Sequence, residues 1–278
     1  NLIDDQTRDG FIGLQVHAIG DNDLPGKKIM WKNINIITDS VAKYSTLTYI
    51  LPVETKNHLS YQEKQEGWKM LWDGKTSNGW RGAKLDHFPE KGWVMEDGNL
   101  IVLAADGKEA ADGGDIVTSD TYGDFELKVD FKITKGANSG IKYYVDTDLN
   151  KGAGSAIGLE YQILDDENHP DAKLGNHEGS RTVASLYDLI KADPNKPINP
   201  IGEWNTAYIL AKNNHVEHWL NGVKVLEYQR NSDAFKKLIS ESKYKIWPGF
   251  GMLERGNILL QDHGNKVYFR NIKINPLN

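Results

Sequence analysis

The chain has 278 residues, with 33 basic and 39 acidic side chains, a formal net charge of −6 and a pI near 5.8. Because the sequence has no dense cluster of Lys and Arg, nucleic acid is not expected as a partner. Cysteine is absent, which excludes disulfides and Cys-ligated metals, and no apolar run approaches the ~18 residues of a membrane-spanning helix. Eight Trp, twelve Tyr and 27 Gly favour an all-β protein with many turns.

One two-stranded unit occurs twice. Residues 10–36 and 256–274 align from their glycines, which places a Gln-x-His triplet at Gln15–His17 and again at Gln261–His263. A long strand-like sequence precedes the second copy, whereas only nine residues precede the first. We therefore interpret residues 1–38 as the C-terminal strands of a preceding homologous domain. Since an isolated hairpin is marginal in water, these strands need partner strands from a missing domain or from another chain.

The sequence that follows predicts mainly short strands. Residues 39–59 are mixed in composition and are interpreted as a linker. A capping box at Ser60–Glu63 predicts a short helix that Gly67 ends, and Asp97-Gly98 and Asn221-Gly222 are typical hairpin turns. Strands are expected at 93–96, 100–103, 125–133, 141–145, 158–164, 185–190, 206–212, 217–220, 223–228 and in the two halves of 256–274.

A second short helix is expected after Ser232, which can act as its N-cap. Many short strands with turn signals and two marginal helices predict a two-sheet antiparallel jelly-roll sandwich over residues 60–278.

Six motifs occur in order along this segment: WKMLWDGKTSNGW at 68–80, NSGI at 138–141, GLEYQILD at 158–165, GEWNT at 202–206, WLNG at 219–222 and LQDHG at 260–264. Together they resemble the 3-keto-disaccharide hydrolase domain family from about Ser60 to Pro276, and residues 10–36 resemble the end of a second copy. The resemblance implies a concanavalin A-like jelly roll of two antiparallel sheets. It also implies a bacterial protein exported to the periplasm or cell surface that acts on a small carbohydrate.

Two neighbouring predicted strands alternate polar and apolar residues. Glu160 and Gln162 share one face of the strand 158–164, and Lys142 and Tyr144 share one face of the strand before it. If the alternate apolar residues fill the core, these four side chains form a polar floor suited to a sugar. The other interpretation is a set of ordinary cross-strand pairs on a solvated face, with Lys142 and Glu160 as a surface ion pair.

Five further residues are candidates for a site. Gln261 and His263 share one face near a strand end, where a histidine is either a structural group or a catalyst. Asp165 begins an acidic loop that either binds a hard cation through oxygens or is simply solvated, and Arg181 lies in a Gly-rich loop within reach of a substrate. Asn138, in the second family motif, completes the expected substrate-binding set. No phosphate loop, nucleophile elbow or metal-ligand spacing occurs, so neither a cofactor nor a metal is expected.

The resemblance implies hydrolysis of 3-keto glycosides by removal of the C2 proton, elimination of the C1 substituent and hydration. Such a reaction needs a base, for which Glu160 and His263 are the candidates, and donors, for which Lys142, Tyr144 and Gln162 are available. An ordinary glucanase-like mechanism needs two carboxylates, and Gln162 occupies the position where a partner of Glu160 on its own strand would lie. A non-catalytic carbohydrate-binding module is the third possibility.

Overall fold

The computed structural model describes residues 56–108 and 113–277. These residues lie in the second of the two units into which the chain divides, Thr55–Asn278. The strands expected in residues 1–38, and most of the expected linker, lie outside the described residues. Within the described part, no helix has the length and apolar character that a membrane crossing requires.

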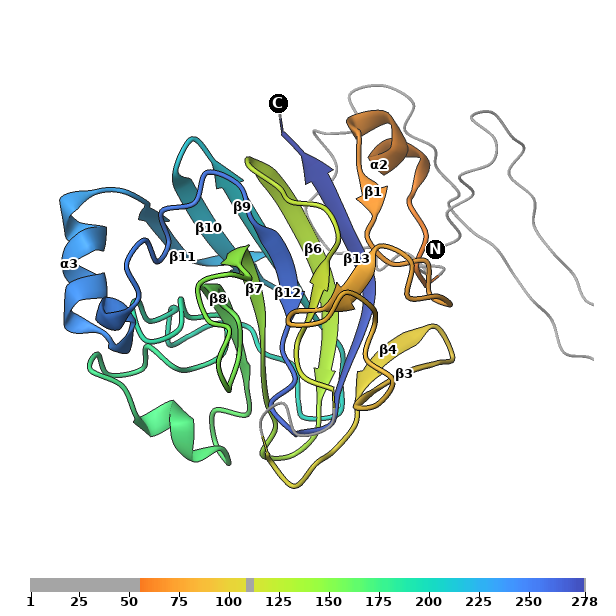
Figure 1. Ribbon diagram of the computed structural model, residues 1–278, viewed down its shortest axis with the longest axis horizontal. Coiled ribbons are helices and arrows are strands. Elements are labelled where there is room, and N and C mark those ends of the chain that lie inside the picture. Colours follow the sequence, from red (N-terminus) through yellow and green to blue (C-terminus); the bar gives the residue numbers. More distant parts are fainter. Residues whose placement is uncertain (1–55, 109–112, 278) are drawn as a thin grey trace, which may run out of the picture. The chain divides into compact units, whose positions relative to one another are not determined.

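Two antiparallel sheets make up this unit. The larger sheet consists of β1 (Lys69–Met70), β3 (Trp93–Glu96), β4 (Asn99–Val102), β6 (Phe125–Ile133), β9 (Asn205–Lys212), β10 (His215–Leu220), β11 (Val223–Gln229) and β13 (Val267–Pro276). The smaller sheet consists of β2 (Trp80–Gly82), β5 (Ile116–Thr118), β7 (Asn138–Asp146), β8 (Ile157–Leu164) and β12 (Asn257–Leu260). The strand orders are β11-β10-β9-β6-β13-β4-β3, with β1 also paired to β13, and β2-β5-β12-β7-β8 (Figure 1).

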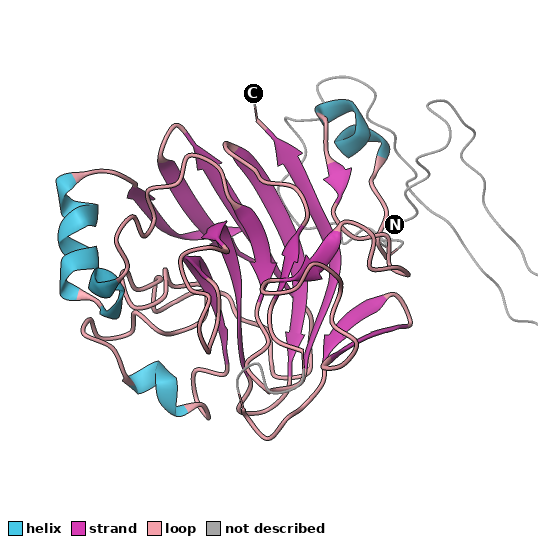
Figure 2. Ribbon diagram, in the orientation of Figure 1, coloured by secondary structure: helices cyan, strands magenta, loops and turns pink. Residues whose placement is uncertain are grey.

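Helices are few and lie outside the sheets, as Figure 2 shows. They are α2 (Tyr61–Glu66), α3 (Asp233–Glu241) and the 3-10 helices η1 (Pro170–Lys173) and η2 (Lys243–Ile246). The predicted capping box is formed at Ser60, and Gly67 ends α2 in the left-handed conformation at φ 94°. Ser232 caps α3 through a hydrogen bond from the amide of Phe235. Both expected short helices are therefore confirmed.

Side chains from both sheets fill one core, which is what the alternation in β6 predicts. The rings of Phe125 on β6 and Tyr143 on β7 meet edge to face with centroids 6.2 Å apart. The Tyr161 hydroxyl on β8 donates to the carbonyl of Trp219 on β10 at 3.1 Å. Because these contacts join the larger sheet to the smaller one, the two-sheet antiparallel jelly roll expected from the sequence is confirmed.

One predicted strand is wrong. Residues 185–190 form a loop. Its β-type pairings are isolated bridges, one of which joins Tyr161 and Leu186. Ala184 and Asp188 have φ of 65° and 63°, and two left-handed residues so close together prevent an extended run. The sequence also gave no signal for β2 and β5, since three residues are too few for alternation to be visible.

Candidate functional site

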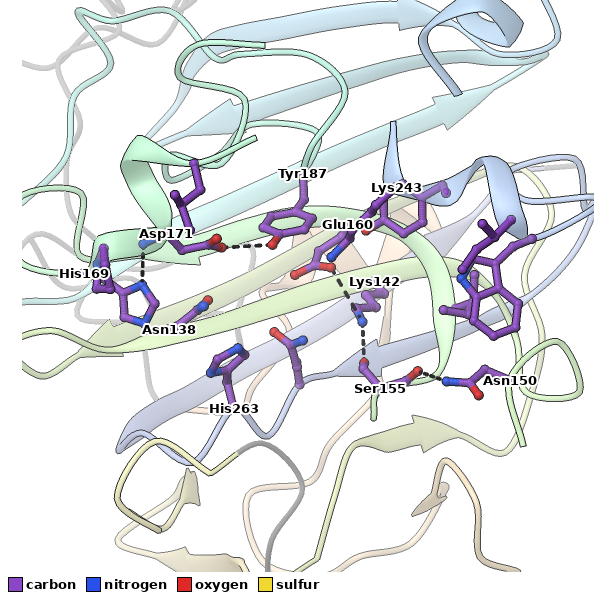
Figure 3. Close-up of a pocket in the computed structure, with 17 residues that line it drawn as sticks. Asn138, Lys142, Asn150, Ser155, Glu160, His169, Asp171, Tyr187, Lys243 and His263 are labelled. Carbon is purple, nitrogen blue, oxygen red and sulfur yellow. Dashed lines mark hydrogen bonds and ion pairs between the residues drawn. The ribbon is translucent and has the colours of Figure 1, made fainter. Parts of the chain in front are cut away.

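A cleft of about 500 Å³ lies on the smaller sheet (Figure 3). Its floor comes from β7, β8 and the residues just after β12, and its walls come from the loops 150–157 and 169–187 and from η2. This volume is in the range of small-molecule sites.

Glu160 lies on the floor of this cleft. Its side chain extends from β8, is 5% exposed, and stands beside Gly140 on β7. A Cβ atom at position 140 would lie 2.9 Å from Glu160 Cδ and closer still to Oε1. The glycine in the NSGI motif therefore provides the space that the carboxylate occupies.

Lys142 is the cross-strand partner of Glu160, and its Nζ lies 3.6 Å from Glu160 Oε2. The same ammonium donates to Ala156 O at 3.2 Å and to Ser155 Oγ, and the Ser155 hydroxyl in turn donates to Asp115. Both side chains of the ion pair are about 5% exposed, so the surface ion pair considered from the sequence is instead a buried one. The carboxylate of Glu160 and these hydrogen bonds together hold the Lys142 ammonium in one position.

The charges around Glu160 act in opposite directions. Burial raises the pKa of Glu160, while the ammonium groups of Lys142 and Lys243 and the ring of His263 oppose the shift. Burial lowers the pKa of Lys243, which lies at the first position of η2 with its Nζ 4.3 Å from the centre of the Tyr187 ring. A carboxyl with a raised pKa beside an amine with a lowered pKa is suited to proton transfer.

A network of ion pairs builds one wall of the cleft. The Tyr187 hydroxyl donates to Asp171 Oδ2 at 2.9 Å, and Arg181 donates to Asp171 at 2.7 Å and to Asp188 at 2.8 Å. Asp188 also accepts the backbone N–H of Lys243 at 3.2 Å. The loop and η2 are thus joined, which fixes Lys243 relative to the floor.

Two buried polar atoms in the cleft have no hydrogen-bond partner among the described residues. They are Gln261 Oε1 and His263 Nδ1. The His263 ring meets that of His169 edge to face at 6.0 Å, and burial together with His263 lowers the pKa of His169. Unpartnered buried polar atoms are costly, and hydroxyl groups of a bound ligand would satisfy them.

The structure brings five of the nine predicted site residues to this cleft, as Figure 3 shows for four of them. They are Asn138, Lys142, Glu160, Gln261 and His263. Their roles in binding and catalysis stay predictions.

Tyr144, predicted to bind substrate, faces the core instead. A β-bulge between Tyr143 and Asp146 breaks the alternation of β7, and Tyr144 has a φ of 50°. Its hydroxyl donates to Gly123 O at 2.9 Å, and the Arg230 guanidinium lies 3.7 Å from its ring centre. The extra residue of a bulge turns the following side chain to the other face of the sheet.

The other three predicted substrate-binding residues lie behind the cleft lining. Gln162 is fully buried and donates to Asn138 Oδ1 at 3.3 Å. Asp165 shapes its own loop by accepting from the amides of Glu167 and Asn168, each at 3.2 Å, and it also accepts from the Gly136 amide in the turn before β7 at 2.7 Å. Arg181 contacts the cleft only through its partner Asp171. These residues support others that line the cleft and do not line it themselves.

Several lining residues were missed from the sequence, namely Ser155, Asp171, Tyr187, Lys243 and Trp247. All lie in loops or in the 3-10 helices η1 and η2, where no periodic pattern relates a residue to the strands that it will face. The available signal was the concentration of charged and aromatic residues outside the long predicted strands.

One group of three side chains among the described residues has metal-like spacing, His215, Glu217 and Glu227 on β10 and β11. Glu217 already accepts from Trp219 Nε1 at 2.8 Å, and Lys224 pairs with Glu227 at 2.7 Å. The group belongs to the larger sheet and does not line the cleft.

A two-sheet jelly roll with a buried carboxylate, two ammonium groups and unpartnered polar atoms in one cleft has the features of a carbohydrate-active hydrolase. Residues 67–275 match the model of the 3-keto-alpha-glucoside-1,2-lyase-like domain family. The chain belongs to this family. The match covers one copy of the domain and does not extend to the predicted second copy at residues 10–36.

Similar proteins agree with this assignment. A 3-keto-disaccharide hydrolase from Bacteroides thetaiotaomicron is 40% identical over 232 residues, which is 76% of this chain and 79% of the relative. A crystal structure from Parabacteroides distasonis, assigned as a glycosyl hydrolase, has a TM-score of 0.70 and 34% identity and covers 80% of this chain and all of its own. A second structure from the same organism, with the same assignment, has a TM-score of 0.53 and 30% identity, over 72% of this chain. The chain is thus an enzyme of the glycosidase-like hydrolase class.

Proposed function

We propose that this enzyme hydrolyses 3-keto glycosides, with Glu160 as the base that takes the proton from C2 of the sugar. The observation that carries the proposal is the placement of Glu160, a carboxyl with a raised pKa on the floor of a cleft, with Lys142 at 3.6 Å. The family description, a lyase, corresponds to the elimination half of such a reaction. The name of the Bacteroides relative corresponds to the complete hydrolysis.

The reaction has two stages. The ketone at C3 acidifies the C2 hydrogen, Glu160 takes that proton, and the electron pair forms the C1–C2 double bond as the C1–O bond breaks. The leaving oxygen receives a proton from a donor, for which Lys243 is available with its lowered pKa. Water then adds its oxygen to C1 and gives one of its protons to the neutral Lys243 amine, and the proton on Glu160 returns to C2. Both side chains are restored, and the sum is hydrolysis.

The ketone oxygen gains negative charge during proton removal, so it needs donors aimed at it. Lys142 and the amide of Asn138 lie in the same cleft and are the available donors. Of the three donors expected from the sequence, Lys142 lines the cleft, whereas Tyr144 and Gln162 do not. Gln261 Oε1 and His263 Nδ1 are free to contact sugar hydroxyls.

Ordinary glycoside hydrolysis needs two carboxylates free to act on either side of the bond. The cleft lining contains one other carboxylate, Asp171, and it is held by Arg181 at 2.7 Å and Tyr187 at 2.9 Å. Asp171 is therefore a structural anion, which favours chemistry that requires a single carboxylate base.

The proposal is tested by incubating the full chain with a 3-keto disaccharide and, separately, with its unoxidised parent. We expect release of the sugars from the 3-keto compound alone. Equal or faster cleavage of the parent would point to an ordinary glycosidase. Saturable binding without cleavage of either compound would point to a carbohydrate-binding module.

A further inference from the structure

We infer that the cleft has a second subsite, which binds an apolar leaving group of the 3-keto glycoside in preference to a second sugar. The inference rests on the proposed function and adds the class of substrate. The subsite is formed by Leu174, Ile246 and Trp247, which we call the apolar rim and which all line the cleft.

The exposure of these side chains is the first observation. Ile246 is 68% exposed and Leu174 is 54% exposed. They are the two most exposed large hydrophobic side chains of the described residues, and both lie at the cleft. Exposed apolar side chains gathered at a site of binding are typical of a surface that a ligand covers.

The helix η2 connects the rim to the reacting groups. Residues i and i+3 of a 3-10 helix lie on the same side, and Lys243 and Ile246 are the first and last residues of η2. One face of this helix thus presents an amine toward Glu160 and an aliphatic side chain further along. A leaving group whose oxygen is protonated by Lys243 would extend its remaining atoms toward Ile246 and Trp247.

The rim is held by a wall that is already formed. Tyr244 stacks on Phe250 with centroids 4.0 Å apart and an interplanar angle of 7°, and the Trp247 amide donates to Tyr244 O at 2.9 Å. Asn176, two residues after Leu174, donates to the carbonyl of Glu241 just before η2. These contacts keep Leu174 and η2 in one wall, so little ordering is needed when a ligand binds.

The chemistry of the rim selects against a sugar. The hydroxyl groups of a second pyranose need hydrogen-bond partners once they lose water, and the side chains of Ile246 and Leu174 offer none. An alkyl or aryl group buries these side chains without that cost. The polar side chains of β7, of β8 and of the segment after β12 lie on the floor, where the 3-keto sugar is placed by the proposed mechanism.

A series of alkyl 3-keto glucosides, from methyl to hexyl, tests the subsite. The alcohols released have nearly equal acidity, so differences in kcat/KM report contacts beyond the glycosidic oxygen. We expect kcat/KM to rise with chain length, mainly through KM, by at most about fourfold per methylene. In the variants Ile246→Ser and Leu174→Ser, the ratio of kcat/KM for the hexyl glucoside to kcat/KM for the methyl glucoside should fall toward one. Val223→Ser is the matched control, since Val223 is 51% exposed on β11 of the other sheet.

If kcat/KM of the unmodified enzyme does not change with alkyl chain length, the subsite is excluded while 3-keto hydrolysis still holds. If none of the 3-keto compounds is cleaved, the proposed function fails. Calorimetric titration of hexyl and methyl 3-keto glucosides then tests the apolar rim, which should bind the hexyl compound more tightly. Equal affinities would overturn it. A change of sedimentation mass in Ile246→Ser, with an unchanged series, would assign the rim to contact between protein molecules and would also overturn it.

Discussion

Glu160 differs from other buried carboxylates in the contacts that its oxygens make. Asp130 accepts from Thr206 at 2.7 Å and from Asn271 at 2.8 Å. The ammonium of Lys142 lies 3.6 Å from Glu160, beyond a normal hydrogen bond. Glu160 thus lacks the short contacts that Asp130 has, which is consistent with its proposed role as the base.

Replacing Glu160 by Gln should lower kcat/KM for a 3-keto glycoside by ~10²–10⁴-fold, because general-base catalysis contributes about that factor. The amide has nearly the same shape, so thermal unfolding should still be cooperative. Glu126→Gln is the matched control, a glutamate on β6 that accepts from Tyr208 at 2.6 Å and does not line the cleft. Unchanged turnover in Glu160→Gln would exclude Glu160 as the base and leave His263 as the candidate.

Gly140→Ala should move the Glu160 carboxylate. The new Cβ would lie 2.9 Å from Cδ of Glu160, and the side chain can yield because only its far end is involved. A displacement of about 1 Å at a catalytic group costs up to ~100-fold in rate, so kcat should fall 10- to 100-fold with little change in the unfolding midpoint. Gly123→Ala is the control, since its nearest contacts would be at 3.4 Å. Wild-type kcat in Gly140→Ala would mean that the carboxylate position is not critical.

Among the secondary-structure elements, β7 contains a bulge that separates residues facing the cleft from a residue facing the core. Asn138, Gly140 and Lys142 follow the regular alternation and face the cleft side, whereas the bulge sends Tyr144 into the core. An Arg230 guanidinium then stacks on Tyr144 at 3.7 Å and donates to Gly251 O at 3.1 Å. The bulge thus ends the floor of the cleft and connects β7 to the segment after α3.

The strand β10 contributes a buried histidine that controls stability toward acid. His218 Nε2 lies 2.8 Å from the Tyr143 hydroxyl, and Nδ1 lies 2.9 Å from Ala184 O, so the neutral ring donates from Nδ1 and accepts at Nε2. Burial lowers the pKa of His218 to about 4, against an ordinary value of 6.5. As pH falls from 6.5 to 4 the unfolded chain binds a proton that the folded protein does not, and folding loses stability.

His218 should therefore contribute up to about 3 kcal/mol of stability above pH 6.5 that is lost by pH 4. The measurement is the free energy of unfolding by denaturant at several pH values across that window. His218→Gln should be less stable at neutral pH and should show a smaller loss toward pH 4. The control His215→Gln removes a half-exposed histidine of the same strand. If the free energy of unfolding changes equally with pH in both variants, His218 is not the cause of the loss of stability toward acid.

At the scale of the whole molecule, the cleft draws on segments spread from Asn138 to His263. The strands that carry these segments lie between Lys69 and Pro276, and they form two sheets with a shared core. The described residues 56–108 and 113–277 thus supply all the strands named above and the cleft lining.

A protein comprising residues 56–278 should therefore fold and retain kcat/KM within about twofold of the full chain. Circular dichroism and assay of a 3-keto glycoside on both proteins provide the measurement. Loss of activity with retained β structure would show that residues 1–55 contribute to the site. The origin of residues 1–38 as the end of a preceding domain, and export to the periplasm or cell surface, stay predictions.

The local structure and the fold class could be predicted from the sequence. Alternation from Phe125 to Ile133, the turns at Asp97-Gly98 and Asn221-Gly222, and the cap at Ser60 each depend on neighbouring residues only. The placement of Glu160 opposite the core also followed from alternation, since Tyr161 and Ile163 fill the interior.

Which residues line the cleft depends on how the chain folds in three dimensions. Lys243 reaches the cleft of Glu160 from a segment distant in sequence, and Asp171 reaches it from η1. No local period encodes either meeting. Tyr144 leaves the cleft because of one extra residue in β7, which costs little locally and is fixed by how β7 pairs with β8. The pKa of Glu160 is raised by burial, and burial exists only once both sheets and the covering loops are in place.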